Sequence, residues 1–163
     1  MTSFDLILIR HAIAEERRIG LAEGDRALTT RGIERFKSLA KAYEALCLSP
    51  QAIWTSPWRR AAHTADLLHP TFPHAKVRVV QSLAAPPDYR FIEQIAEAPS
   101  PLILVGHEPW LSELAGILTI GTPETSIRLK KGGLIWLNGC AEAAGMFTKI
   151  VLAPATTLKL LNT

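Results

Sequence analysis

Two histidines follow the two most apolar segments of the sequence, and the first has an arginine beside it. The run Phe4–Ile9 ends at Arg10-His11, and the run Pro101–Gly106 ends at His107. Short unbroken apolar runs are typical of strands that are covered on both faces, as in a parallel sheet. Ligands of open α/β sheets bind beyond the carboxyl ends of the strands, so we expect both imidazoles to face one crevice.

A third segment has the composition of an anion site. Residues 55–61, Thr-Ser-Pro-Trp-Arg-Arg-Ala, follow one predicted strand and begin a predicted helix. A helix N-terminus offers free backbone N–H groups, and an arginine adds a planar fork that matches phosphate oxygens. Arg59 and Arg60 diverge by roughly 100° on a helix, so at most one of them is expected to face the crevice. Histidines together with arginines are suited to handling a phosphoryl group without a metal ion.

Other chemistries lack their usual sequence patterns. His11 and His107 lie 96 positions apart, whereas metal-binding histidines usually have short spacings such as His-Glu-x-x-His. The sequence contains neither a Gly-x-x-x-x-Gly-Lys phosphate loop nor a Gly-x-Ser-x-Gly nucleophile elbow. Cys47 and Cys140 have the spacing of neither a zinc site nor a disulfide framework. We therefore expect no metal ion and no cofactor.

The rest of the sequence predicts the elements that must position these residues. Helices are predicted over Thr30–Cys47, with Thr29 or Thr30 as N-cap, and over Arg59–Leu68, Asp88–Ala98 and Pro109–Leu118. Weaker strands are predicted over Ala52–Thr55, Val77–Val80, Leu134–Leu137 and Met146–Leu152. Strands that alternate with helices indicate an α/β three-layer sandwich, with a mainly parallel central sheet and helices on both faces. The segments from Lys131 onward can add antiparallel strands.

Composition places further limits on the protein. The 163 residues, 48% hydrophobic and 20% charged, predict a single globular domain over residues 1–163. A net charge of +3 is too small for a nucleic-acid or membrane-surface binder, although it allows anionic small ligands. No apolar run approaches the ~18 residues that span a bilayer, and no secretory signal is evident. We expect a cytoplasmic protein, monomeric by default, that binds neither nucleic acid nor membrane.

Four segments, in order and spacing, resemble the histidine phosphatase superfamily. They are Arg10-His11-Ala12, Leu28-Thr29-Thr30-x-Gly32, Ser56-Pro57-x-x-Arg60-Ala61-x-x-Thr64-Ala65 and Val105-Gly106-His107. The Arg-His-Ala-x-Ala-Glu opening and the short chain look like the small SixA-type branch, described as phosphohistidine phosphatases. Ala12 stands where the superfamily's triplet has glycine, which we interpret as a mark of this branch. The resemblance runs from Phe4 to about Leu118 and implies a phosphoglycerate mutase-like fold.

The resemblance also implies a role for each matched residue. His11 would be the nucleophile that takes the phosphoryl group on a ring nitrogen, forming a phosphohistidine intermediate. Arg10 and Arg60 would clamp the phosphate oxygens, and His107 would donate a further charge-assisted hydrogen bond. Arg26 matches a position where this branch carries an arginine near the pocket.

A nucleophilic histidine must be neutral at the attacking nitrogen, so its other nitrogen should donate to a fixed acceptor. We expect that acceptor to be a backbone carbonyl near Ala12. We also expect the surrounding cations to depress the pKa of His11 and so favour the neutral ring.

The general acid is the part that the resemblance leaves open. Larger members supply a glutamate from an inserted segment, for which this chain has little room. The candidates are Glu108, Asp88 and Glu15. Each has a structural alternative: Asp88 as the N-cap of a helix, Glu108 as a first-turn residue favoured by the helix dipole, and Glu15 as a solvated charge.

A weak or missing acid has a consequence for the substrate. An alkoxide departs poorly without a proton donor, whereas a protonated phosphohistidine already carries a good leaving group. We therefore expect a phosphatase that acts on phosphohistidine in protein partners, as in signal transduction. The alternatives are a small-molecule phosphomonoesterase with Glu108 or Asp88 as acid, and a catalytically silent phosphate-binding module. The short chain predicts an open pocket, although the segment Ala14–Leu28 could close over it.

Overall fold

The protein is described from a computed structural model that covers residues 3–46, 48–124, 127–140 and 147–153. These residues form one six-stranded sheet in the order β3-β2-β4-β1-β5-β6. The strands are β1 (Ser3–Arg10), β2 (Ala52–Thr55), β3 (Lys76–Val79), β4 (Leu102–Gly106), β5 (Leu134–Cys140) and β6 (Phe147–Ala153). Strands β1 to β4 are parallel, while β5 and β6 add an antiparallel pair beside β1.

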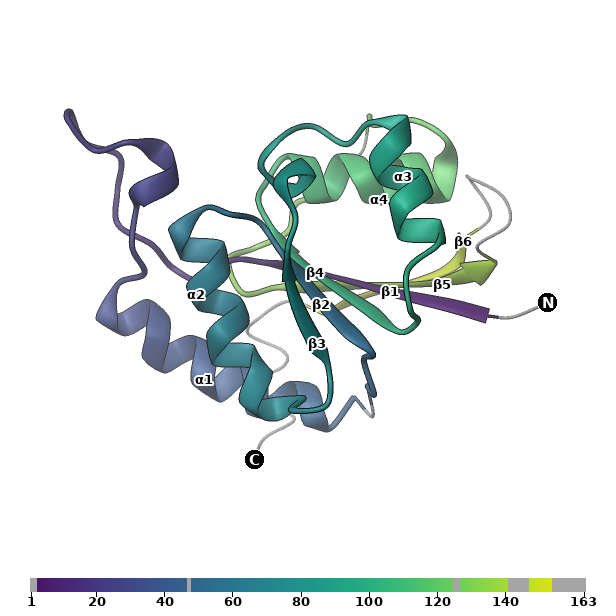
Figure 1. Cartoon of the computed structure of the whole chain (residues 1–163), viewed down its shortest axis with the longest axis horizontal. Coiled ribbons are helices and arrows are strands. Elements are labelled where there is room, and N and C mark those ends of the chain that lie inside the picture. Colours follow the sequence, from purple (N-terminus) through teal and green to yellow (C-terminus); the bar gives the residue numbers. More distant parts are fainter. Residues whose placement is uncertain (1–2, 47, 125–126, 141–146, 154–163) are drawn as a thin grey trace.

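Helices cover both faces of the sheet, as predicted. Helices α1 (Thr30–Glu44) and α2 (Arg59–Leu68) lie on one face, and α3 (Tyr89–Ala96) and α4 (Trp110–Ile120) lie on the other (Figure 1). Three 3-10 turns complete the described elements: η1 (Glu23–Asp25), η2 (His69–Thr71) and η3 (Gln81–Ala84). None of the helices in the described ranges is long and apolar enough to cross a membrane.

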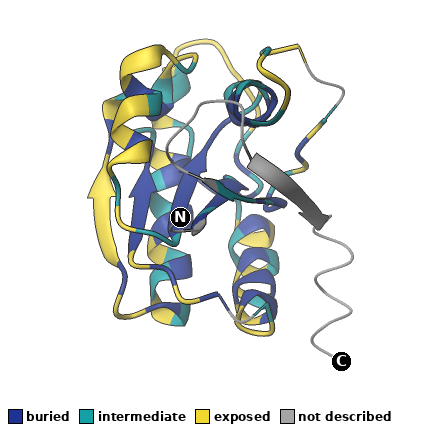
Figure 2. Ribbon diagram, turned by 90° about the vertical axis from the view of Figure 1, so that its right-hand side faces the viewer, coloured by how far each residue is buried: buried dark blue, intermediate teal, exposed yellow. Residues whose placement is uncertain are grey.

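The apolar run of β1 is divided between two cores because successive side chains of a strand point to opposite faces. Ile7 and Ile9 pack with α1 and α2, whereas Leu6 and Leu8 pack with α3 and α4. Figure 2 shows the central strands buried, while the edge strand β3 is exposed along its length. The continuous apolar runs therefore identify the strands that have helices on both sides.

Element boundaries differ from the sequence prediction by a few residues. Helix α1 ends at Glu44, and its predicted end at Cys47 lies outside the described residues. Helix α3 begins after Asp88, whose side chain accepts from the Phe91 N–H and caps it. Helix α4 continues past the predicted end to Ile120, where Gly121 stops it at a φ of 76°. The predicted strand Met146–Leu152 is observed as β6, with Met146 outside the described residues.

The N-terminus of α1 packs against the segment that follows β1. Thr29 caps the helix by accepting from the Gly32 N–H at 3.0 Å, as predicted. The backbone N–H of Thr29 in turn donates to the Ile13 carbonyl at 3.0 Å. A Cβ on Gly32 would lie 2.1 Å from that same carbonyl oxygen, so only glycine permits the close approach. This contact fixes the backbone two residues after His11.

We predict that Gly32→Ala destabilises the protein. In an unobstructed helix, glycine to alanine stabilises by about 0.5–1 kcal/mol, because alanine loses less conformational entropy on folding. Here the backbone must shift, and overpacking of this kind costs about 1–3 kcal/mol. Urea denaturation measures the difference, and Lys37→Ala on the exposed side of α1 is the control, expected within about 0.5 kcal/mol of wild type. A stabilised Gly32→Ala variant would contradict the tight contact.

Candidate active site

Three parallel strands end at the same edge of the sheet and deliver the candidate residues there. His11 follows β1, His107 follows β4, and Ser56 follows β2. The backbone N–H of His11 donates to the Gly106 carbonyl at 3.0 Å, which joins the two strand ends. The imidazole centroids of His11 and His107 are 5.2 Å apart. The two histidines therefore share one crevice, as their positions after the apolar runs predicted.

The hydrogen bonds of His11 define which ring nitrogen carries the proton. Nδ1 lies 2.7 Å from the Ala12 carbonyl oxygen, which can only accept, so Nδ1 is the donor. Nε2 lies 3.1 Å from Nε of Arg60, which can only donate, so Nε2 is the acceptor. The predicted backbone acceptor at Ala12 is confirmed. The lone pair of Nε2 is directed at the guanidinium side of the crevice.

The pKa of His11 is strongly depressed, to about 2. Burial is the main cause, because the ring is removed from water. The bond to Ala12 works in the opposite direction, whereas the charges of His107, Arg60 and Arg10 lower the pKa further. The sequence prediction named the cations alone, and the structure corrects it by placing burial first. The ring is unprotonated at Nε2 at neutral pH.

Arg60 is held against His11 by the first turns of α2. Its side chain is 3% exposed, and its guanidinium carbon lies 4.6 Å from the centre of the Trp58 ring. Thr64 donates to the Arg60 carbonyl and accepts from the Ala12 N–H, so it ties the helix to the segment that carries His11. Burial lowers the pKa of Arg60 to about 10, which leaves it charged at neutral pH. Arg59 is exposed, so Arg60 is the arginine that faces the crevice.

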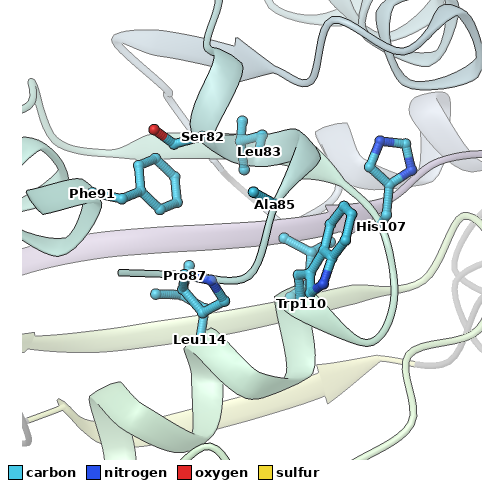
Figure 3. Close-up of a pocket in the computed structure, with 9 residues that line it drawn as sticks. Ser82, Leu83, Ala85, Pro87, Phe91, His107, Trp110 and Leu114 are labelled. Carbon is cyan, nitrogen blue, oxygen red and sulfur yellow. The ribbon is translucent and has the colours of Figure 1, made fainter. Parts of the chain in front are cut away.

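His107 is braced by aromatic rings and by the end of β2. Its Nε2 lies 2.8 Å from Ser56 Oγ, and its ring centroid is 4.5 Å from Trp58 and 6.0 Å from Trp110. Figure 3 shows Trp110 beside a small apolar hollow with His107 at its edge. Burial, followed by the charge of Arg60, lowers the pKa of His107 to about 3. The free site therefore presents a neutral His107, and a hydrogen bond from its ring N–H to a phosphate oxygen would be charge-assisted through the negative charge of the ligand.

Buried polar atoms without hydrogen-bond partners gather at this crevice. Among the described residues they are Arg10 Nε, His107 Nδ1, Glu108 Oε2 and, elsewhere, Arg35 Nε. Arg10 also donates from Nη1 to the Leu129 carbonyl at 2.8 Å, which orients its guanidinium. An unpaired buried donor or acceptor destabilises the folded protein. Several such atoms close together therefore indicate a site that a ligand completes.

An open pocket of about 430 Å³ joins these groups. Its lining combines cationic and acidic side chains with the two histidines: Arg10, His11, Glu16, Arg17, Glu23, Arg26, Arg60, His107, Glu108 and Lys131. The segment between Ala14 and Leu28 supplies one wall. The described residues contain no group of three or more His, Cys, Asp and Glu side chains placed to hold a metal ion.

The sequence did not mark four of these lining residues, Glu16, Arg17, Glu23 and Lys131, and Glu23 is the one that bonds to Arg60. Its Oε1 accepts from Arg60 Nη2 at 2.9 Å and from Arg26 Nη1 at 2.7 Å. Arg26 therefore does lie at the pocket, where the Glu15 carbonyl also holds it through Nε at 2.8 Å. No sequence motif marked Glu23, and the only available signal was its position three residues before Arg26.

The three candidates for a general acid lie in different surroundings. Asp88 caps α3 and does not line the pocket. Glu15 does not line it either, and its carboxylate accepts from the Ala27 N–H at 3.0 Å. Asp88 is therefore the helix cap that its alternative interpretation described, whereas Glu15 is not a solvated charge but a half-buried carboxylate that binds backbone. Glu108 does line the pocket, and burial raises its pKa although its bond to Ser112 works in the opposite direction. Glu108 is thus the candidate that lies at the pocket, and its pKa is shifted in the direction that favours a proton donor.

Solved structures of other proteins share the fold of this chain. A putative phosphohistidine phosphatase SixA from Agrobacterium tumefaciens matches with a TM-score of 0.73 at 20% identity, covering 93% of this chain and 98% of that one. SixA complexed with tungstate matches with a TM-score of 0.73 at 18% identity, covering 91% and 96%. A putative α-ribazole-5'-P phosphatase from Escherichia coli matches with a TM-score of 0.74 at 21% identity, covering 93% and 98%. The predicted phosphoglycerate mutase-like α/β fold is confirmed.

Sequence comparison extends the match from fold to family. An uncharacterized protein of Picosynechococcus is 36% identical over 142 residues, which cover 84% of this chain and 86% of that protein. The sequence model of the histidine phosphatase superfamily (branch 1) matches residues 6–84, which include His11, Arg26 and Arg60. With two histidines and an arginine clamp gathered at the carboxyl edge of a parallel sheet, this chain belongs to the histidine phosphatase superfamily.

Proposed function

We propose that the protein is a metal-independent phosphatase that works through a phosphohistidine on His11 and acts on phosphohistidine in protein partners. Family membership supports a phosphatase. The observation that carries the mechanism is the pair of bonds on the His11 ring, which place the proton on Nδ1 and the lone pair on Nε2. A buried imidazole in this state is a nucleophile at neutral pH without a separate base.

The first step transfers the phosphoryl group to His11. Once the Arg60 Nε–H has moved from the Nε2 lone pair to a phosphate oxygen, Nε2 attacks phosphorus, a P–N bond forms, and the bond from phosphorus to the leaving atom of the substrate breaks. Arg10, Arg26 and Arg60 neutralise the charge that spreads over the oxygens, which is most of what phosphoryl transfer requires. If the leaving group is an imidazole protonated at its other nitrogen, it departs as neutral histidine and takes no proton from the site.

The second step returns the enzyme to its starting state. Because Nδ1–H stays bonded to the Ala12 carbonyl, the phosphorylated His11 ring is cationic and is itself a good leaving group. Water attacks phosphorus and the P–Nε2 bond breaks. The water oxygen becomes part of inorganic phosphate, both of its protons remain on that phosphate as H2PO4−, and His11 leaves as the neutral ring. The carbonyl of Ala12 therefore serves both steps.

The open pocket supports a substrate carried on another protein. The Arg17 side chain at its wall is 81% exposed, so this side of the site is accessible to solvent. Fold similarity does not choose between substrates, since the SixA structures and the α-ribazole phosphatase match with nearly equal TM-scores. The choice therefore depends on the chemistry of the leaving group.

Glu108 favours a second candidate function, a small-molecule phosphomonoesterase. Its buried Oε2 has no partner, and burial raises its pKa, which favours the protonated carboxylic acid relative to an exposed glutamate. A protonated acid at the pocket would supply the proton that an alkoxide leaving group needs. The two functions share His11 and the arginines, and they differ only in whether Glu108 donates a proton.

We expect His11→Asn to abolish turnover while the fold is retained, because the variant lacks a nucleophilic ring nitrogen. Rapid quenching of wild-type enzyme with a ³²P-labelled phosphoryl donor should trap an acid-labile, base-stable protein phosphate. Peptide mapping should place that phosphate on His11 and find none in His11→Asn. Turnover by a folded His11→Asn variant would exclude the covalent mechanism. Saturable phosphate binding by wild type without any turnover would instead identify a silent binding module.

Arg60 and its neighbour offer a matched pair. We predict that Arg60→Ala raises the free energy of the transition state by at least about 2 kcal/mol, roughly thirtyfold in kcat/KM, because one preorganised donor is lost. Arg59→Ala removes the same charge from the exposed side of α2 and should change kcat/KM by less than about threefold. Steady-state kinetics check both values, with thermal unfolding to confirm that each variant is folded. Equal effects would show that bulk charge, not contact, matters.

Glu108→Gln separates the two candidate substrates. If Glu108 donates a proton to esters, hydrolysis of phosphate esters should fall as pH rises through its raised pKa, because the protonated fraction declines. The Gln variant should lose ester hydrolysis and this descending limb, while hydrolysis of a phosphohistidine peptide is retained. Wild-type rates on peptide and on sugar phosphates, measured side by side, decide the physiological class. A tenfold or greater preference for sugar phosphates would favour the second function.

A further inference from the structure

The carboxylate of Glu23 lies where oxygens of a phosphoryl group are expected. Two guanidinium groups, those of Arg60 and Arg26, donate to the same oxygen, Oε1, at 2.9 and 2.7 Å. The second oxygen, Oε2, accepts from Arg17 Nε at 3.0 Å. An anionic oxygen bound between two forks is the arrangement that arginines make with phosphate. The free site is therefore already occupied by an anion of the chain itself.

A guanidinium can bind two phosphate oxygens through either of two edges, each formed by a pair of nitrogens, and both edges of Arg60 already have partners. The edge formed by Nε and Nη2 holds His11 Nε2 and Glu23 Oε1, at 3.1 and 2.9 Å. The edge formed by Nη1 and Nη2 holds the Glu23 carbonyl at 2.6 Å and the same Oε1. Both edges include Nη2, so a bidentate contact with phosphate through either one requires the Glu23 side chain to leave.

Glu23 also competes through its charge. Burial alone would raise its pKa, but the bonds and charges of Arg26 and Arg60 outweigh burial and hold the pKa below its ordinary value. Glu23 is therefore a carboxylate at neutral pH. A phosphoryl dianion bonded to the same nitrogens would face this negative charge at close range, and like charges at such a distance repel strongly.

The position of Glu23 allows it to leave. It begins the short turn η1, in a segment that Figure 1 shows projecting beyond the helices. Its side chain is 31% exposed, and the Arg17 side chain that binds Oε2 is 81% exposed. The carboxylate can move outward while it keeps Arg17 as a partner. Arg60 meanwhile retains the Glu23 carbonyl, which holds the guanidinium near His11.

We propose that Glu23 is a built-in competitor for the phosphoryl site, and that it lowers the affinity of the site for oxyanions. This inference rests on the proposed function for the identity of the site and extends it. A ligand binds only when Glu23 has left, so its apparent affinity falls by the fraction of molecules in which the clamp is free. The factor is the same for every ligand, so inorganic phosphate, which has few other contacts, is left with the weakest binding. A phosphorylated substrate with additional contacts can displace Glu23, and the phosphate product is then released readily.

Binding of inorganic phosphate to the full chain tests this inference without requiring turnover. Isothermal titration calorimetry at one neutral pH gives the Kd for wild type, Glu23→Gln and Glu23→Ala. We expect both variants to bind phosphate at least about tenfold more tightly than wild type. This is the factor expected when Glu23 occupies the clamp in nine-tenths of the wild-type molecules. Alanine shows that the gain does not come from a new amide contact. Thermal unfolding confirms that each variant is folded.

Glu16→Gln is the matched control. Glu16 lines the same pocket and carries the same charge, but its side chain is exposed and is not bonded to Arg60 or Arg26. We expect its Kd to change by less than about threefold, because a solvated charge is screened. A gain as large as that of Glu23→Gln would mean that general charge, not occupation of the clamp, limits binding, and would overturn the inference.

The remaining outcomes distinguish this inference from the proposed function. If wild type binds phosphate and Glu23→Gln binds it equally or more weakly, Glu23 positions the arginines and is not a competitor. In that case only the present inference fails. If wild type and both Glu23 variants all fail to bind phosphate, the phosphoryl site itself is wrong and the proposed function fails with it. Binding by the Glu23 variants alone would support competition most strongly.

Discussion

The site depends on keeping one ring nitrogen unprotonated beside a guanidinium. Removing the His11 ring from water makes its cationic form costly, and the Ala12 carbonyl then directs the single remaining proton to Nδ1. Arg60 completes the arrangement by donating to Nε2. Each of these conditions is met by backbone or by a buried side chain, so the ring that we propose as the nucleophile is neutral and oriented before any ligand arrives. Chemistry that would otherwise need a separate base is supplied by burial and one carbonyl.

The parallel sheet makes this arrangement possible. His11, Ser56 and His107 come from distant parts of the sequence, yet each follows a strand whose carboxyl end lies at one edge. Two cores hold the strands from either face, and the contact between Gly32 and the Ile13 carbonyl fixes the backbone just beyond His11. Rigid elements therefore set the positions of the strand-end residues in the proposed site, while the projecting segment around η1 supplies only the outer wall of the pocket.

Charge balance explains why a site rich in arginine can remain stable without a ligand. Arg26 and Arg60 share the Glu23 carboxylate, so the free protein does not bring uncompensated cations together. Arg10, His107 and Glu108, each with one unpaired buried polar atom, all line the same pocket. The same surroundings produce opposite results for two acids, since arginines lower the pKa of Glu23 whereas burial raises that of Glu108. Two glutamates that line one pocket thus have pKa values shifted in opposite directions, because their immediate neighbours differ.

The sequence by itself determined the elements and the residues that end them. Apolar runs, helical spacing and caps are local patterns, so they predicted the α/β sandwich, the Thr29 cap and the placement of His11, His107 and Arg60 at one edge. Only the tertiary structure decided which acids reach the pocket, placing Glu108 there and leaving Asp88 as a helix cap. It alone revealed Glu23, which meets Arg60 across 37 positions of sequence. Such contacts join irregular segments whose path depends on the packing of the whole molecule, so no local sequence pattern predicts them.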